Sequence, residues 1–234
     1  MQRALHGFCW ALAIALGAGC RSEPRAAAPA PEATTSGATT SGATTSGATA
    51  LTGAAPVPAP SPGAKVAPDQ RSVALLAGGC FWGMEELLRK LPGVTNISVG
   101  YTGGDLKNPV YEDVHTGTTN HAESVRVEFD PSVLSYERLL LYFFSIHDPT
   151  TKDRQGNDIG TQYRSAIFVL DAEQRRVAMS VIARVAASGD WKAPITTEVV
   201  DARQFYPAEE YHQDYLQKHP GGYTCHYPRQ VSFY

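Results

Sequence analysis

The chain has 234 residues, a formal net charge of −3 and 43% hydrophobic residues, a length that allows one or two domains. The small negative charge leaves no basic footprint, which argues against binding of nucleic acid. No apolar run reaches the length of a membrane-spanning helix.

The first 20 residues are predicted to be an export signal. Arg3 supplies a positive start, and residues 8–16 form a short apolar segment. Leu-Gly-Ala-Gly-Cys at 16–20 is similar to the lipobox of bacterial lipoproteins, although its leucine lies one position further from the cysteine than usual. We therefore expect Cys20 to carry lipid and the protein to be extracytoplasmic, either membrane-anchored or periplasmic. An ordinary cleaved signal, or a soluble protein with an apolar start, is the alternative.

Residues 21–70 are predicted to be a disordered linker. Three copies of Ala-Thr-Thr-Ser-Gly occupy 33–47, and five prolines follow at positions 56, 58, 60, 62 and 68. Large apolar residues are few, so burial cannot offset the entropy lost on ordering. Residues 71–234 have the composition of a single globular domain.

Residue periodicity predicts alternating strands and helices in this domain. In chain order we expect strand 72–77, helix 84–91, strand 94–101, strand 122–130, helix 135–147, strand 165–170, helix 172–187, strand 196–200 and helix 209–217. This order predicts the α+β class, as a two-layer sandwich with a mixed sheet and a ferredoxin-like core.

The positions of the cysteines leave two thiols in the mature domain. Cys9 would be removed with the signal and Cys20 would carry lipid, so that Cys80 and Cys225 remain. In an exported protein such a pair most often forms a structural disulfide. A working redox couple is the alternative, and the count of cysteines leaves both open.

Cys80 lies in Gly-Gly-Cys-Phe-Trp-Gly at 78–83, where a predicted strand gives way to a predicted helix. The unpaired N–H groups and the positive dipole end of a helix stabilise a thiolate, which is the nucleophilic form of cysteine. The position therefore predicts a reactive thiol. A buried structural cysteine is the alternative, because free cysteine is among the most buried residue types.

Glu123 breaks the pattern of the strand predicted at 122–130. It shares the parity of Val125, Val127 and Phe129, so its carboxyl falls on the face that should be buried. Burial raises the pKa of a carboxyl, and a protonated acid near neutral pH can donate a proton. The alternative is a frayed strand end that turns Glu123 to water.

Three polar loop segments, 108–111, 154–165 and 221–226, are candidates for the rim of a site. Tyr111 and Tyr163 in the first two carry hydroxyls that can donate hydrogen bonds to an oxygen with negative character. For each tyrosine taken alone, ordinary packing with a polar tip in water is the preferred interpretation.

Five ordered segments together resemble the MsrA-type peptide methionine sulfoxide reductases. They are Gly-Cys-Phe-Trp-Gly at 79–83, Gly-Tyr-Thr-Gly-Gly at 100–104, the segment 117–123 ending His-Ala-Glu, His-Asp-Pro at 147–149, and the segment 155–165 from Gln-Gly-Asn-Asp to Tyr-Arg-Ser. The resemblance spans most of residues 73–225 and does not include residues 1–70.

The resemblance implies a role for each matching residue. Cys80 corresponds to the nucleophile that attacks the sulfoxide sulfur, and Cys225 to the resolving cysteine. Glu123 corresponds to the acid that protonates the sulfoxide oxygen. Tyr111 and Tyr163 correspond to tyrosines that hydrogen-bond that oxygen, and Asp158 to a residue that orders the site. Phe81 and Trp82 correspond to the apolar pocket for the S-methyl group of the substrate. Many family members carry two cysteines in the tail, whereas this chain has only Cys225.

The implied reaction converts methionine-S-sulfoxide, free or in oxidised proteins, to methionine, without a metal or organic cofactor. Cys80 becomes a sulfenic acid, which condenses with Cys225 to a disulfide. A dithiol protein of the thioredoxin type would reduce that bond. The implied activity is repair of oxidised proteins, and nothing in the sequence suggests more than a monomer.

Two other functions would use the same residues. A surface binding module would hold Cys80 and Cys225 in a static disulfide that resists reduction by thioredoxin. A peroxidase would form the same sulfenic acid on Cys80 with peroxide as its substrate.

Overall fold

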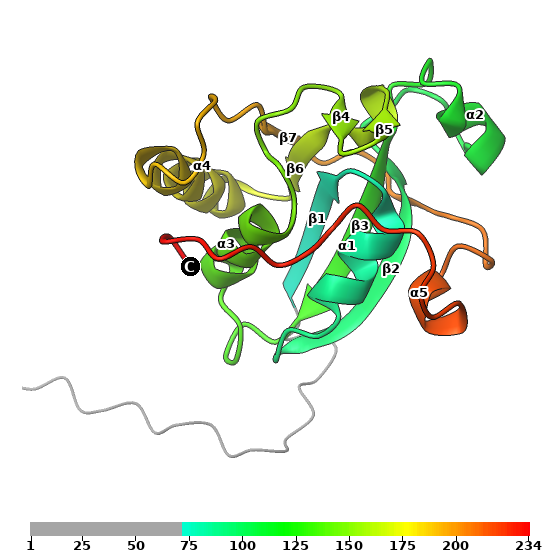
Figure 1. Cartoon of the computed structure of the whole chain (residues 1–234). Helices are drawn as coiled ribbons and strands as arrows, with labels where there is room; N and C mark the ends of the chain where they lie inside the picture. The colour runs from blue at the N-terminus through cyan, green and yellow to red at the C-terminus, as the bar shows by residue number, and fades with distance from the viewer. Residues whose placement is uncertain (1–71) are drawn as a thin grey trace, which may run out of the picture. The chain divides into compact units, whose positions relative to one another are not determined.

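A computed structural model describes residues 72–234 of the chain (Figure 1). The predicted signal, the lipid site at Cys20 and the linker lie outside the described residues. No helix within 72–234 combines the length and the apolar character that crossing a membrane requires.

Four strands and two helices form the centre of the domain in the order β-α-β-β-α-β. They are β1 (Ser72–Gly78), α1 (Phe81–Leu88), β2 (Val94–Thr102), β3 (Ala122–Phe129), α3 (Tyr136–Ile146) and β6 (Ser165–Val169). The strands lie in the order β6-β1-β3-β2, and all neighbours among them are antiparallel. This is the arrangement of a ferredoxin-like core, and it confirms the predicted α+β class.

Two further strands extend this sheet to six and make it mixed. β7 (Glu198–Asp201) pairs parallel to β6, and β8 (Tyr206–Pro207) pairs antiparallel to β2. The other elements are α2 (Tyr111–His115), the two-stranded sheet of β4 (Arg154–Gln155) and β5 (Asp158–Ile159), the 3₁₀ turn Thr161–Tyr163, α4 (Ala172–Ala187) and α5 (Tyr215–Lys218).

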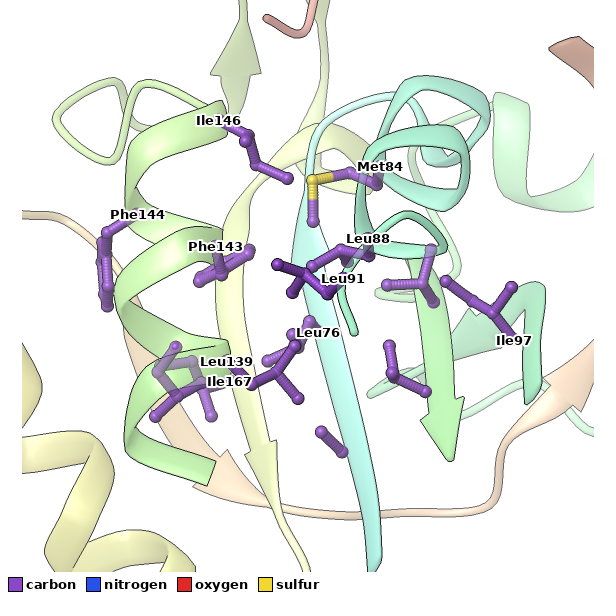
Figure 2. Close-up of a cluster of buried hydrophobic side chains, with 14 of the residues drawn as sticks. Leu76, Met84, Leu88, Leu91, Ile97, Leu139, Phe143, Phe144, Ile146 and Ile167 are labelled. Atoms are coloured by element: carbon purple, nitrogen blue, oxygen red, sulfur yellow. The ribbon is translucent and has the colours of Figure 1, made fainter. Parts of the chain in front are cut away.

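Helices α1 and α3 cover one face of the sheet and enclose the main hydrophobic core. Figure 2 shows Leu88 of α1 and Phe143 of α3 pointing toward one another above β1, where Leu76 lies between the helices. All three side chains are fully buried. Packing of these side chains between the sheet and its helices fixes where α1 begins relative to β1.

The opposite face of β1 is buried as well, under the segment that leads from β7 to β8. Leu75 and Ala77 of β1 pack with Phe168 of β6, and Phe205 of the covering segment closes this second cluster. A strand buried on both faces reads as a continuous apolar run, which explains why residues 72–78 show no alternation.

Three of the four predicted helices have different bounds in the structure. The helix predicted at 135–147 differs least, since α3 is Tyr136–Ile146 with Ser135 and His147 as its caps. Helix α1 begins at Phe81 and not at residue 84. The prediction used the apolar residues from 84 onward and missed the first turn, in which Phe81 and Gly83 are also buried. The helix predicted at 209–217 is short, Tyr215–Lys218, since Asp214 before it adopts a left-handed φ of 57°. Elements α2, β4, β5 and β8 were not predicted.

The C-terminal tail crosses α1 and ends beside α3 (Figure 1). The backbone N–H of Arg229 donates to the Ser145 carbonyl of α3 at 3.0 Å. On α1, a Cβ added to Gly83 would lie 2.2 Å from Oγ1 of Thr224 and 2.6 Å from Nδ1 of His226. Glycine at 83 is therefore what lets the tail approach the first turn of α1.

We expect Gly83→Ala to lower the free energy of unfolding by about 1–3 kcal/mol, as overpacking does, despite the better helix propensity of alanine. Urea denaturation of the full chain measures this difference. Glu86→Ala on the solvent side of the same helix is the control and should stay within about 0.5 kcal/mol of the parent. A Gly83→Ala protein as stable as the parent would show that the tail does not pack as described.

Candidate active site

Cys80 lies in the turn between β1 and α1 and caps the helix with a φ of −51° and a ψ of 121°. Gly79 before it has a φ of +103°, and a Cβ there would lie 2.5 Å from Cβ of Gln155. The turn therefore requires glycine for both conformation and space. It leaves the Cys80 side chain 6% exposed at the start of α1.

A cavity of about 180 Å³ opens at this turn. Its walls come from the start of α1, the start of α2, strand β3, strand β5, the 3₁₀ turn and the C-terminal tail. The lining residues are Cys80, Phe81, Trp82, Tyr111, Glu123, Asp158, Tyr163 and Tyr223. The structure thus brings together seven of the residues singled out in the sequence, from segments up to 83 positions apart along the chain.

Glu123 lies within strand β3, opposite Tyr101 of β2, and is only 3% exposed. The carboxyl is therefore buried, and the alternative of a frayed strand end is excluded. Its Oε2 accepts a hydrogen bond from the backbone N–H of Phe81 at 3.1 Å. Burial raises the pKa of Glu123 to about 8; the Phe81 N–H opposes this rise, and the nearby charge of Asp158 adds to it.

The resting state of Cys80 differs from the sequence-based expectation. Burial, followed by the charge of Glu123, raises the pKa of the Cys80 thiol well above its usual range. The backbone N–H of Trp82, which belongs to the helix terminus, lowers it only in part. The predicted stabilisation of the thiolate is present but is outweighed, because the same turn that meets the helix end is also buried beside a carboxyl.

Tyr111, at the start of α2, and Tyr163, at the end of the 3₁₀ turn, both line the cavity. Burial and the charge of Glu123 raise the pKa of both phenols, so both stay protonated and able to donate. Tyr111 is held at the start of α2, where its backbone N–H donates to Oε1 of Glu209 at 2.8 Å.

Phe81 and Trp82 supply the apolar part of the cavity. Trp82 stacks on Tyr215 of α5, with ring centroids 3.8 Å apart and an interplanar angle of 13°, and its indole N–H donates to Nδ1 of His212 at 3.2 Å. Phe81 is fully buried against Tyr101, at 5.9 Å between ring centroids. The supporting roles of Tyr215 and His212 were not predicted, since neither lies in a recognisable pattern.

Cys225 does not line the cavity but contacts Asp158, which does. Its Sγ donates to Oδ2 of Asp158 at 3.3 Å, and both cysteines are free thiols. Burial and Asp158 raise the pKa of Cys225 to about 12, and the backbone amide of Cys80 offsets part of this rise. The turn at Gly156 lies against it, at 3.1 Å from the Cys225 Cβ to a Cβ added there.

Tyr223 is a cavity residue that the sequence analysis placed in a polar segment without assigning it a role. Its hydroxyl donates to Oδ1 of Asp158 at 3.0 Å, so Asp158 joins the tail to strand β5 through both carboxylate oxygens. Among residues 72–234, no three His, Cys, Asp or Glu side chains are grouped so that they could hold a metal ion.

Comparison with known families matches residues 72–233 to the family described as peptide methionine sulfoxide reductase. A curated relative named peptide methionine sulfoxide reductase MsrA, from Nocardia farcinica, is 60% identical over 156 residues, which cover 67% of this chain and 89% of the relative. A relative of the same name from Streptomyces coelicolor is 57% identical over 160 residues, covering 68% and 91%.

Solved structures agree with this match. Mxr1 from Saccharomyces cerevisiae in its reduced form is 37% identical with a TM-score of 0.67, covering 71% of this chain and 96% of that chain. Methionine sulfoxide reductase A of Corynebacterium diphtheriae is 39% identical with a TM-score of 0.59, covering 66% and 78%. On the family match, these identities and the shared fold, the chain belongs to the MsrA-type peptide methionine sulfoxide reductases.

Proposed function

We propose that this enzyme reduces methionine-S-sulfoxide, free or within proteins, by oxygen transfer to Cys80, followed by a Cys80–Cys225 disulfide that a thioredoxin-type dithiol protein reduces. The observation that carries the proposal is the shared cavity of Cys80 and the buried acid Glu123. A cavity of about 180 Å³ suits a single methionine side chain.

The cavity has one polar and one apolar wall, which orient the sulfoxide. The oxygen faces Glu123, Tyr111 and Tyr163, which all hold protons at neutral pH. The methyl group faces the rings of Phe81 and Trp82. This orientation leaves the sulfoxide sulfur next to Cys80, so that the nucleophile and the acid act on adjacent atoms of the substrate.

The first step moves oxygen from the substrate to Cys80. Glu123 protonates the sulfoxide oxygen, which makes the substrate sulfur electrophilic, and the Cys80 sulfur attacks it to form an S–S bond. The oxygen then moves to the Cys80 sulfur as this S–S bond and the S–O bond of the substrate break. The thiol proton of Cys80 replaces the one that Glu123 gave, so the carboxyl ends as it began. The products are methionine and the sulfenic acid of Cys80, and all atoms balance.

The second step forms the disulfide. The Cys225 sulfur attacks the Cys80 sulfenic acid, the S–O bond of Cys80 breaks, and water leaves. Cys225 is suited to this role because its thiol lies against Asp158 of the cavity and beside the backbone of Cys80. Thiol–disulfide exchange with an external dithiol then restores both thiols.

The chain is also proposed to act outside the cytoplasm as a lipoprotein. The support is the sequence alone: the positive Arg3, the apolar residues 8–16 and the lipobox-like residues 16–20. A lipid on Cys20 would hold the protein at a membrane, with residues 21–70 as the connection to the enzyme domain.

Substitution of the two cysteines separates the two steps. We expect Cys80→Ser to form no methionine, because the nucleophile is lost. Cys225→Ser should form about one methionine per enzyme and then stop with thioredoxin as reductant, since no disulfide arises. Chromatographic counting of methionine against enzyme measures both. Sustained turnover of Cys225→Ser with thioredoxin would contradict its resolving role, and activity in Cys80→Ser would contradict the nucleophile.

The acid role of Glu123 predicts a pH dependence. Because its pKa is raised to about 8, the protonated form is present below that pH and is lost as the pH rises through it. The rate of methionine formation in single turnovers should therefore fall about tenfold per pH unit above pH ~8. Glu123→Gln should be slower and lack this fall, because an amide donates a hydrogen bond but does not titrate, and Glu123→Ala should be slower still. Equal rates and equal pH profiles in all three proteins would exclude Glu123 as the acid.

Lipidation can be measured directly. Cells that express the full chain and are fed a labelled fatty acid should incorporate label into this protein and should not do so with Cys20→Ala. Cys9→Ala is the matched control, since that cysteine lies inside the signal, and it should retain the label. Equal labelling of the Cys20→Ala protein would contradict the assigned attachment site.

A further inference from the structure

His226 lies behind the substrate cavity and has no part in the steps described so far. It follows Cys225 directly and is only 5% exposed. It is not among the residues that line the cavity. Its imidazole nevertheless contacts the resolving thiol, with 3.5 Å between Nδ1 of His226 and Sγ of Cys225.

The hydrogen bonds of the ring fix its tautomer. Nε2 lies 2.7 Å from the carbonyl oxygen of Gly78, and because a carbonyl only accepts, Nε2 carries the proton. Burial holds the pKa of His226 down at about 4; the Gly78 carbonyl opposes this, and the charge of Arg229 reinforces it. The ring is therefore neutral at physiological pH, and Nδ1 offers an unprotonated lone pair to Cys225.

The surroundings of the ring hold it in this orientation. The backbone N–H of His226 donates to Oγ1 of Thr224 at 3.1 Å, which makes a tight turn around Cys225. The ring edge lies against α1 at Gly83, where an added Cβ would come within 2.6 Å of Nδ1. Rotation of the ring would break the bond to Gly78, so the lone pair stays directed at the thiol.

We propose that His226 is the base that takes the thiol proton of Cys225 when Cys225 attacks oxidised Cys80; this rests on the function proposed above. The S–H bond of Cys225 breaks and its proton moves to Nδ1. The S–S bond forms as the S–O bond of Cys80 breaks. The proton passes from the imidazole to the departing hydroxyl, so water leaves and the ring returns to its neutral form. The Cys225 sulfur is oxidised by one electron equivalent, and the Cys80 sulfur is reduced by one.

Asp158 is the other acceptor near the thiol, at 3.3 Å from Sγ of Cys225. Its Oδ1 already accepts a hydrogen bond from the hydroxyl of Tyr223 at 3.0 Å, so one of its two oxygens is occupied by the tail. Its charge also favours the protonated form of His226. Asp158 thus stabilises the imidazolium that the transfer creates, while His226 accepts the proton.

The test follows both steps in one experiment. The full chain is mixed with one equivalent of methionine-S-sulfoxide and no reductant, and samples are quenched in acid at intervals. Methionine in each sample reports the proposed function, and the Cys80–Cys225 disulfide, measured by mass spectrometry of peptides, reports the second step. His226→Gln is the test variant, because its amide N–H can still reach Gly78 but no lone pair is left at the Nδ1 position.

We expect the ratio of disulfide formation to methionine formation to fall at least about tenfold in His226→Gln, within the range of general-base effects. Added imidazole should restore part of the loss. Between pH ~5 and ~8 the rate of disulfide formation in the parent should not change with pH, because His226, which is surrounded by Cys225, Asp158, Arg229 and His147, stays neutral over this range. In His226→Gln the rate should rise with pH, because the Cys225 thiol must then lose its proton to water. Tyr227→Phe, at an exposed tail position, is the matched control and should behave as the parent.

Three results would overturn the proposal. One is an unchanged ratio and pH profile in His226→Gln. Another is a reduced ratio with a flat profile and no rescue by imidazole, which would assign His226 a structural role only. The last is loss of the second step in Asp158→Asn together with a normal His226→Gln, which would make Asp158 the base. Failure of the parent to form methionine would instead refute the proposed function, and this proposal with it.

Discussion

The hydrogen bond from the Phe81 backbone to the buried Glu123 carboxyl is the interaction on which the rest of the site depends. It joins strand β3 to the first residue of α1, immediately after Cys80, and thereby sets the acid and the thiol at one cavity. One N–H bond does not offset the loss of hydration of a carboxylate, so the carboxyl keeps its proton near neutral pH. The first turn of α1 is therefore itself part of the environment of the Glu123 carboxyl.

Four of the ionisable groups that line the cavity, those of Glu123, Tyr111, Tyr163 and Cys80, are held in their neutral forms. Glu123, Tyr111 and Tyr163 have pKa values above their usual ones, and burial is the main cause in each case. The nucleophile is held as a thiol for the same reason. In the proposed reaction, a neutral sulfoxide enters such a site without displacing a counter-ion, and charge arises only when the oxygen begins to take its proton.

The sequence allowed prediction of the elements and residues that have a strong local signature. Helix α4 has the bounds that were predicted, because 16 residues of helical periodicity and an Asp171 cap leave little choice. Glu123 was expected to be buried from its parity along β3, and the structure bears this out. By contrast, α2, β4, β5 and β8 have two to five residues each, too few for a period, and they form because longer elements bring their partners together.

The properties that escaped prediction depend on contacts between distant segments. The helix end beside Cys80 was evident from the sequence, but the burial that outweighs it comes from the cavity walls as a whole. Gly83 was recognised as part of a motif, but glycine is needed there because the tail, about 140 residues further along the chain, packs against it. No periodic pattern in the sequence indicates that contact. The orientation of the His226 ring depends on its hydrogen bond to the carbonyl of Gly78, which lies 148 positions away, so the sequence alone could not predict it.

The segment of residues 223–226 contributes two groups to the site. Tyr223 lines the cavity, and Cys225, two residues later, holds the sulfur that we propose resolves the Cys80 sulfenic acid. In the proposed function, a reductant protein that displaces residues 223–226 to reach this sulfur also displaces Tyr223 from the cavity wall. Under the proposed function, binding of the oxidised side chain and binding of the electron donor would therefore exclude one another, and the connection between Tyr223 and Cys225 would keep the two half-reactions apart.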